Sequence, residues 1–382
     1  MRSVGLDLGA RHIAYCEVRD GEVVDRAGVE GLDDLRHRIG PGTAPARIGF
    51  EASREAWHVH ELLSSWGHEP KIVDTTRLKL IGVGQHNRKN DALDAECIAR
   101  AVYENRLPEA HLLSPGRREL RKKLSVRHAL VETRAQYVTT IRGLLRAEGA
   151  LLPSCATHNF LERLAATTLS EPVRMLVAPL TSTLEGIDEQ LAHVDDELEL
   201  LAKHDPLIQL CATAPGVGLI VAATFLSVLD DPRRFKSAHA VSAYLGLVPS
   251  ESTTGGPSKR RLGSITKQGN GHARAMLVQA AWALLRSGRK RGDDPIRTWG
   301  LRIAKRRGKS VAAVAVARRL AGVLWAMCRD GAFYAPAEQA AASAAGIRRR
   351  MVDDAAHAAA LEQAANKIRR RPRRKISEVA ST

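Results

Sequence analysis

The stretch "SVGLDLGARHIAYCEVRDGEVVDRAGV" (Ser3–Val29) decides the fold of the first part of the chain. Its apolar residues alternate as they do on β-strands, and the Asp20-Gly21 dipeptide is typical of a two-residue hairpin turn. Two short apolar runs, at residues 46–53 and 70–74, read as further strands, with a helical segment between them. Strands followed by alternating helix and strand predict an α/β layer domain over residues 1–110.

The rest of the chain is predicted to be mostly α-helical. Over residues 111–205, apolar residues recur with the spacing of a coiled-coil seam. This spacing fits the two arms of a helical hairpin, an intermolecular coiled coil, or two helices of an ordinary bundle. The residues that form the pattern are Leu124, Val131, Val138, Leu145, Leu184, Ile187, Leu191, Val194, Leu198 and Leu201.

Two more segments complete the expected organisation. Residues 206–333 read as a mainly α-helical domain that contains a loop rich in Ser, Thr and Gly. Residues 334–382 are rich in alanine and then in arginine, a composition typical of a disordered tail that binds polyanions. The predicted fold class is therefore an α/β domain, a helical middle and a mainly α-helical C-terminal domain.

Charge narrows the choice of partner. The 382 residues carry a formal net charge of +16. Nucleic acid is the leading partner because neutralisation of phosphates drives the binding of basic proteins. No segment reads as a membrane-spanning helix or as a signal peptide, so no membrane partner is expected. Five cysteines without a CxxC spacing argue against a zinc ribbon or a disulfide scaffold and favour a reducing, cytoplasmic location.

Four acidic residues stand where acids are unusual. Asp7 lies within an apolar strand and Glu51 ends another, and a buried carboxylate is costly unless it is paired or binds a metal. In "RKNDALDAECIAR", Asp91 and Asp94 lie one turn apart at a helix start, where alone they read as capping residues. If the strands of Asp7 and Glu51 lie side by side and the helix packs against the same edge of the sheet, the four carboxylates form an all-oxygen site that suits Mg²⁺ or Mn²⁺. Such a site predicts metal-dependent phosphoryl chemistry.

A family resemblance rests on these motifs. "GLDLGA", "FEAS" and "KNDALDAECIAR" resemble the D-E-D-D pattern of the RuvC-like (RNase H-like) domain in transposases of the insertion-sequence 110 and 1111 families. In the second half, "APGVG", "FKSAHAVSAYLGLVPSESTTGG", "KRRLGSITKQGNGHARAMLVQAAW" and "AVARRLAGVLWAM" resemble the C-terminal transposase domain of that family. The resemblance covers residues 3–333.

The resemblance implies a DNA recombinase that is guided by a structured noncoding (bridge-type) RNA, which pairs with donor and target DNA. It implies that Asp7, Glu51, Asp91 and Asp94 bind Mg²⁺ and act in catalysis. It also implies a dimer or tetramer in which two subunits build a composite active site, in the cytoplasm and associated with the nucleoid.

The same resemblance implies a serine nucleophile that forms a covalent bond to DNA. At the matching position, five residues after Pro249, this chain has Thr254, followed by a glycine. A threonine hydroxyl supports the same chemistry once it is activated. Ser252 and Thr253 are the alternatives.

Basic residues flank both motifs and are candidates for contacts to nucleic acid. Beside a phosphodiester they would hold the backbone or stabilise developing charge, whereas alone they read as a solvated basic face. They are Arg88, Lys89, Lys259, Arg260, Arg261, Lys267 and Arg274. Two other functions fit the same residues: a Mg²⁺-dependent junction-resolving nuclease that uses water, and a non-catalytic nucleic-acid-binding scaffold.

Overall fold

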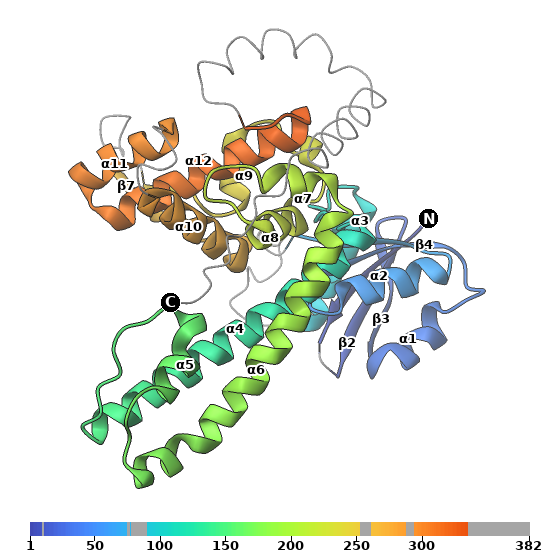
Figure 1. Ribbon diagram of the computed structural model, residues 1–382. Coiled ribbons are helices and arrows are strands. Elements are labelled where there is room, and N and C mark those ends of the chain that lie inside the picture. The colour runs from blue at the N-terminus through green and yellow to red at the C-terminus, as the bar shows by residue number, and fades with distance from the viewer. Residues whose placement is uncertain (10, 75–76, 78–89, 253–260, 288–293, 335–382) are drawn as a thin grey trace. The chain divides into compact units, whose positions relative to one another are not determined.

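The computed structural model describes residues 1–9, 11–74, 77, 90–252, 261–287 and 294–334 (Figure 1). The chain divides into two compact units, Met1–Leu112 and Leu113–Thr382, which are considered separately below. The first unit is mixed α/β and the described part of the second is almost entirely helical. The predicted basic tail lies outside the described residues, apart from its first residue.

The first unit is built on a five-stranded sheet with the strand order β3-β2-β1-β4-β5. β1, β2 and β3 form an antiparallel meander, whereas β4 and β5 run parallel to β1. Asp20 and Gly21 form the turn between β2 and β3 with positive φ angles of 51° and 87°, as the sequence predicted. The strands are β1 (Arg2–Leu8), β2 (Ile13–Arg19), β3 (Glu22–Val29), β4 (Ala46–Glu51) and β5 (Glu69–Val73).

Helices cover both faces of this sheet. On one face, fully buried Leu6 and Phe50 pack in a core with α1 (Gly31–Ile39) and α2 (Ala56–Ser65). On the other face, α3 (Asp91–Tyr103) packs against Ala14, Cys16 and Val18 of β2 through small alanines. Because successive side chains of a strand point to opposite faces, the residues next to Leu6 and Phe50 face α3.

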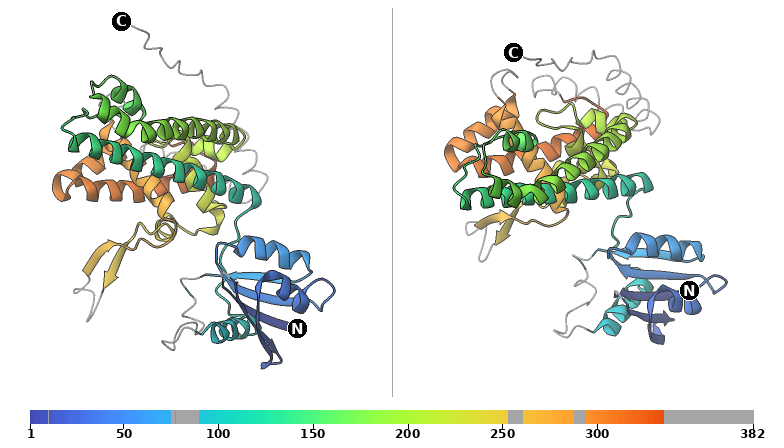
Figure 2. Two further views of the ribbon diagram at one scale, coloured as in Figure 1. Left: turned by 90° about the horizontal axis from the view of Figure 1, so that it is seen from below. Right: turned by 60° about the horizontal axis from the view of Figure 1, so that its bottom comes forward.

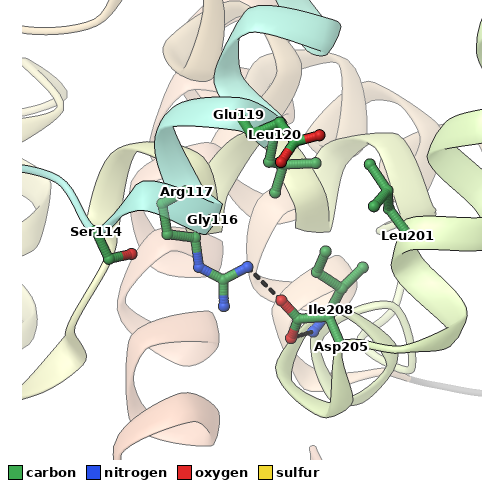
Figure 3. A pocket seen from close by; sticks show the side chains of 8 residues that line it. All are labelled: Ser114, Gly116, Arg117, Glu119, Leu120, Leu201, Asp205 and Ile208. Carbon is green, nitrogen blue, oxygen red and sulfur yellow. Dashed lines mark hydrogen bonds and ion pairs between the residues drawn. The ribbon is translucent and has the colours of Figure 1, made fainter.

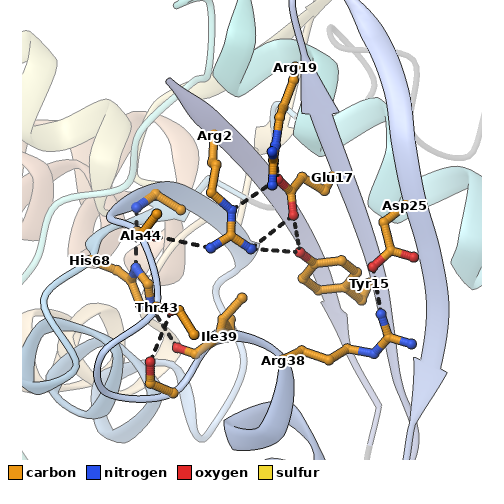
Figure 4. Close-up of polar contacts among 12 residues, drawn as sticks. Arg2, Tyr15, Glu17, Arg19, Asp25, Arg38, Ile39, Thr43, Ala44 and His68 are labelled. Carbon is orange, nitrogen blue, oxygen red and sulfur yellow. Dashed lines mark hydrogen bonds and ion pairs between the residues drawn. The ribbon is translucent and has the colours of Figure 1, made fainter.

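A buried ionic network lies on the face of β1 and β2 away from α3 (Figure 4). Arg2 donates two hydrogen bonds of 2.9 Å to the Glu17 carboxylate, and Tyr15 and Arg19 each donate one of 2.6 Å. Burial raises the pKa of Glu17, but the hydrogen bonds from Arg2, Tyr15 and Arg19 outweigh it and lower this pKa to about 2. Burial, together with the hydrogen bond to Glu17, also raises the pKa of Tyr15. The network adds ion pairing between β1 and β2 to the apolar contacts that the two strands share in the core.

In the second unit, α4 (Pro115–Ala147) and α6 (Glu171–Lys203) form an antiparallel helical hairpin (Figures 1 and 2). Ion pairs join the two helices. As the residue number of the basic partner on α4 increases, that of the acidic partner on α6 decreases, as expected for antiparallel helices. The pairs are Lys123–Glu197, Arg127–Asp195 and Arg134–Asp188. Within one chain, the two helices are therefore paired as a helical hairpin, which is one of the three arrangements that fit the heptad spacing.

The heptad pattern predicted only part of this interface. Leu124 and Leu145 are buried as expected, but Val131 is 36% exposed while Arg134, one turn further on, is buried. The reason is that α4 packs against both α6 and α8 (Leu219–Leu229), so no single stripe of α4 is covered along its whole length. A separate small core fills the far end of the hairpin, around Phe160 of α5 (Phe160–Ala165).

The remaining helices surround one central helix, α12 (Lys309–Asp330). They are α7 (Pro206–Cys211), α9 (Ala238–Tyr244), α10 (Gly271–Arg286) and α11 (Pro295–Arg307). A short antiparallel pair, β6 (Pro249–Ser252) and β7 (Arg261–Ile265), extends from this bundle (Figure 2).

The expectation that no segment could span a membrane needs a correction. By length and apolarity alone α12 passes that test, and it is the one helix among the described residues that does. More than half of its most apolar window is buried, because Val316, Leu320 and Leu324 form the centre of the second unit's core. Its apolarity is therefore explained by packing inside the protein.

Candidate active site

Asp7 and Glu51 lie next to each other on parallel strands. The paired residues Leu6 and Phe50 precede them in the register of β1 and β4. Asp7 therefore shares a face with Gly5, and Glu51 shares the same face with Gly49. Both carboxylate side chains are half-buried at the carboxyl ends of their strands.

α3 covers this face at very short range. A Cβ built on Gly5 would lie 2.1 Å from the Ala95 carbonyl oxygen, and one on Gly49 would lie 2.7 Å from a methyl group of Val102. The two glycines thus allow the backbone of α3 to approach the sheet closely.

The start of α3 is fixed by Asn90. Its side-chain oxygen accepts hydrogen bonds from the backbone N–H groups of Ala92 (3.1 Å) and Leu93 (3.4 Å). The structure therefore makes Asn90 the N-cap, and the interpretation of Asp91 as the cap is wrong because Asp91 already has helical geometry. Asp91 is exposed, and Asp94 is half-buried.

Asp91 and Asp94 continue the stripe of α3 that faces the sheet. Positions 91, 94, 95 and 98 share one side of a helix, and Ala95 and Ile98 are buried against the strands. Asp91 and Asp94 thus lie on the side of α3 that faces the sheet, at the start of the helix and before the apolar residues that pack against the sheet.

The direction of α3 decides at which end of the sheet these two carboxylates lie. Arg100, near the end of α3, donates a hydrogen bond of 3.1 Å to the carbonyl of Gly21, at the hairpin beside the start of β1. At the other end, Asp91 lines a pocket with His12 and Ala14. Ala14 is the cross-strand partner of Asp7. α3 is therefore antiparallel to β1, and its start lies at the end of the sheet that carries Asp7 and Glu51.

The donor set fits a hard cation, since all four groups are carboxylates. Yet among the described residues, no three His, Cys, Asp or Glu side chains are gathered closely enough to hold a metal ion. The structure thus places the four backbone positions at one end of one face, and the convergence of their oxygens on a cation stays a prediction.

The pocket at the start of α3 was not predicted from the sequence. Besides Asp91, it is lined by His12, which directly precedes β2, and by Arg26 of β3. The only sequence signal was that His12 follows Asp7 by five residues, which is too short a motif to interpret alone.

Most of the other predicted site residues lie outside the described residues. These are Arg88, Lys89, Thr253, Thr254, Lys259 and Arg260. Ser252 and Arg261 are placed only as the ends of β6 and β7, the strands that flank the segment containing Thr254.

Lys267 and Arg274 are described. Lys267 is exposed, in a left-handed conformation with φ 56°. Arg274 donates hydrogen bonds to the carbonyls of Leu245 (3.1 Å) and Gln268 (2.9 Å), so it fastens the loop after β7 to the end of α9. One guanidinium nitrogen of Arg274 therefore stabilises the local fold.

A second pocket lies at the base of the helical hairpin (Figure 3). Two of its charged groups, Arg117 and Asp205, form an ion pair with each other. The same Asp205 carboxylate caps α7 by accepting hydrogen bonds from Leu207 (2.9 Å) and Ile208 (3.2 Å). This pocket is a structural joint rather than a reactive site.

An α/β unit with an Asp, a Glu and an Asp-x-x-Asp at one end of its sheet, followed by a helical unit, is the arrangement expected of a DEDD-type transposase. The comparison with known families agrees, since a model described as "Transposase", of the IS110 DEDD type, matches residues 4–148. A second model, "Transposase IS116/IS110/IS902 family", matches residues 208–296. The chain belongs to this family of insertion-sequence transposases, and the family resemblance predicted from the motifs is confirmed.

Curated relatives extend over most of the chain. A "Putative transposase y4pF/y4sB" of Sinorhizobium fredii is 31% identical over 299 residues, which are 78% of this chain and 76% of the relative. The "Transposase for insertion sequence element IS1111A" of Coxiella burnetii is 30% identical over 337 residues, 86% of this chain and 89% of the relative. A "Probable family 20 transposase" of Pseudomonas aeruginosa is 29% identical over 298 residues, covering 76% and 86%.

Proposed function

We propose that this transposase cuts and rejoins donor and target DNA by metal-assisted phosphoryl transfer, through a covalent bond between protein and DNA, under the guidance of a noncoding bridge-type RNA. The observation that carries the proposal is the arrangement in the first unit. Asp7 and Glu51 end adjacent parallel strands, and the start of α3 brings Asp91 and Asp94 to the same end of the same face.

The strand order supports a RuvC-like (RNase H-like) fold for this unit. An antiparallel meander is followed by two strands parallel to the first, and a helix crosses the face that carries the acids. The four carboxylates would hold Mg²⁺ or Mn²⁺, because hard divalent cations prefer oxygen ligands. When bound, such a cation supplies Lewis-acid stabilisation of the charge that develops on the phosphate oxygens.

Thr254 is the proposed nucleophile. Its hydroxyl oxygen attacks the phosphorus of a DNA phosphodiester and forms a new P–O bond, while the bond from phosphorus to one bridging DNA oxygen breaks. The hydroxyl proton passes to solvent, and the departing DNA oxygen takes up a proton. In the rejoining step, a hydroxyl of another DNA end attacks the same phosphorus and releases Thr254.

The partners follow from the same family resemblance. Donor and target DNA bind as substrates, and the guide RNA selects them by base pairing. Arg88, Lys89, Lys259, Arg260, Arg261, Lys267 and Arg274 would contact these nucleic acids. The active site would combine the carboxylates of one subunit with Thr254 of another subunit of a dimer or tetramer, in the cytoplasm and on the nucleoid.

The test is recombination between two plasmids, with purified full-length protein, the element's flanking noncoding RNA and Mg²⁺. Asp7→Asn and Thr254→Ala should each abolish recombination, whereas Asp33→Asn, on the exposed surface of α1, should leave it unchanged. Wild-type protein should remain attached to nicked DNA on a denaturing gel, and Thr254→Ala should not.

Other results would replace the proposal by one of its alternatives. Nicked DNA with free ends, equally abundant for wild type and Thr254→Ala, would identify a nuclease that uses water. DNA binding without Mg²⁺-dependent cleavage, and unaffected by Asp7→Asn, would identify a scaffold. Recombination that is independent of the RNA would remove the guide from the proposal but leave the chemistry.

A further inference from the structure

One helix of the second unit carries a dense cluster of cations. Arg302, Lys305, Arg306 and Arg307 lie in the last two turns of α11, and Lys309 begins α12. All five side chains are exposed. Within the part of the chain that the structure describes, none of them has an acidic partner within salt-bridge distance. These five residues are called the α11 basic face below.

Packing fixes the direction in which this face points. The opposite side of α11 is held against α12, where Ile296 and Gly300 are buried. Gly300 permits close contact, since a Cβ there would lie 2.6 Å from a methyl group of Val316. Arg302, Lys305 and Arg306 lie on the other side of the helix and face solvent. Arg307, the last residue of α11, and Lys309 extend the cluster around the end of the helix.

The cluster contrasts with the basic residues of the hairpin. Lys123, Arg127 and Arg134 each have an acidic partner across the hairpin, so their charge serves the fold. On α11, cations three and four residues apart repel one another, and only the negative end of the helix dipole offsets part of this repulsion. Uncompensated repulsion of this kind is relieved by a bound polyanion.

A pocket lies on the same helix and points to the kind of polyanion. It is lined by Trp299, Arg302, Ile303 and Arg306. Trp299 is half-buried, and the Arg319 guanidinium lies 5.0 Å from its ring centroid. An aromatic ring beside guanidinium groups is the combination that proteins use to hold bases together with their phosphates.

We propose that the α11 basic face binds the phosphodiester backbone of a nucleic acid, through residues other than those of the proposed catalytic site. The bound strand lies along α11, with phosphates on Arg302 and Arg306 and on neighbouring lysines. The shared chemistry is that of the phosphodiester, and either DNA or RNA supplies it. This inference is independent of the catalytic proposal, because it requires neither metal nor cleavage.

The experiment measures binding of the full chain to labelled duplex DNA, single-stranded DNA and structured RNA in EDTA, over a range of salt concentrations. The variant is Arg302→Gln/Arg306→Gln. The matched control, Arg36→Gln/Arg163→Gln, removes the same charge from two other exposed arginines, on α1 and α5, that have no acidic partner among the described residues. A third variant, Arg302→Lys/Arg306→Lys, keeps the charge.

The Gln variant should bind about tenfold more weakly, with a salt-dependence slope smaller by about 1.8 on duplex DNA or about 1.4 on single strands. The lysine variant should bind nearly as well as wild type, and the control should change little. The nucleic acid that shows the largest loss identifies the ligand. Equal losses in the Gln variant and the control, or no loss in either, would overturn the proposal. An unchanged thermal unfolding curve for the Gln variant excludes misfolding as the cause.

Discussion

The backbone of Gly5 in β1 and that of Ala95 in α3 are in direct contact, so close that a Cβ on Gly5 would stand 2.1 Å from the Ala95 carbonyl oxygen. This contact sets the height of α3 above the sheet. It thereby sets the positions of the two aspartates at the helix start relative to Asp7.

Gly5→Ala should push α3 away from the sheet. Overpacking of this kind costs about 1–3 kcal/mol of unfolding free energy, because neither backbone can yield freely. Recombination should fall further than stability alone explains, since the carboxylates separate. Urea unfolding and the plasmid assay measure the two effects. Gly143→Ala, at an exposed position of α4 with open space around it, should leave both unchanged or raise stability slightly.

Asn90→Ala should remove the cap of α3 at a cost of about 1 kcal/mol, because two backbone N–H groups lose their acceptor. Asn90→Ser or Asn90→Asp should restore most of the loss. We expect Asn90→Ala to lower Mg²⁺-dependent recombination in the plasmid assay, at a protein concentration where DNA binding is retained. Full activity of Asn90→Ala would show that the first turn of α3 does not position Asp91 and Asp94.

Glu17 makes the first unit sensitive to acid. Its pKa in the folded protein is about 2, below the ordinary value of 4.5, so its stabilising effect is complete above pH 5 and is lost as the pH falls towards 2. Glu17→Gln should therefore cost about 2 kcal/mol at pH 7 and progressively less below pH 5. Unfolding free energies at several pH values test this, with exposed Glu30→Gln as control. A difference that stays constant from pH 7 to pH 2.5 would contradict it.

The helical hairpin depends on the Arg134–Asp188 pair. Arg134 is 7% exposed and also donates a hydrogen bond of 2.9 Å to the carbonyl of Thr157. Asp188→Ala should destabilise the second unit by about 2–3 kcal/mol, because it leaves a buried guanidinium without its counter-charge. Glu189→Ala, which removes an exposed carboxylate one residue later, should have almost no effect on the melting temperature. Equal melting temperatures for the two variants would show that the pair contributes little.

Local patterns predicted much of the fold. The alternation around Asp7, the Asp20-Gly21 turn and the helix after Asn90 depend on residues near one another in the chain, and the structure confirms them. The acids at positions 7 and 51 were noticed because a carboxylate at the end of an apolar strand is unusual. Their placement on neighbouring parallel strands is not visible in the sequence, since strand order depends on contacts between distant segments.

Long-range charge pairs account for most of what the sequence did not reveal. Nothing near Arg134 in the sequence indicates that Asp188 will bury it, and nothing near Glu17 indicates that Arg2 will lower its pKa. The heptad spacing also does not reveal that α4 packs against α8 as well as α6, or that Val131 is 36% exposed. An apolar stripe on a helix predicts that the helix packs against another element, but it does not identify that element.

The central position of α12 has a consequence for how the chain is made. This helix is the last described element of the chain, and it packs against α7, α9, α10 and α11. During translation, the second unit must wait with its apolar surfaces uncovered until residue 331 has left the ribosome, whereas the first 112 residues have long been free to fold. A frameshift or stop codon between Leu113 and Lys309 would leave apolar surfaces of the second unit uncovered and expose the product to proteases, even though every acidic residue of the proposed site had already been synthesised.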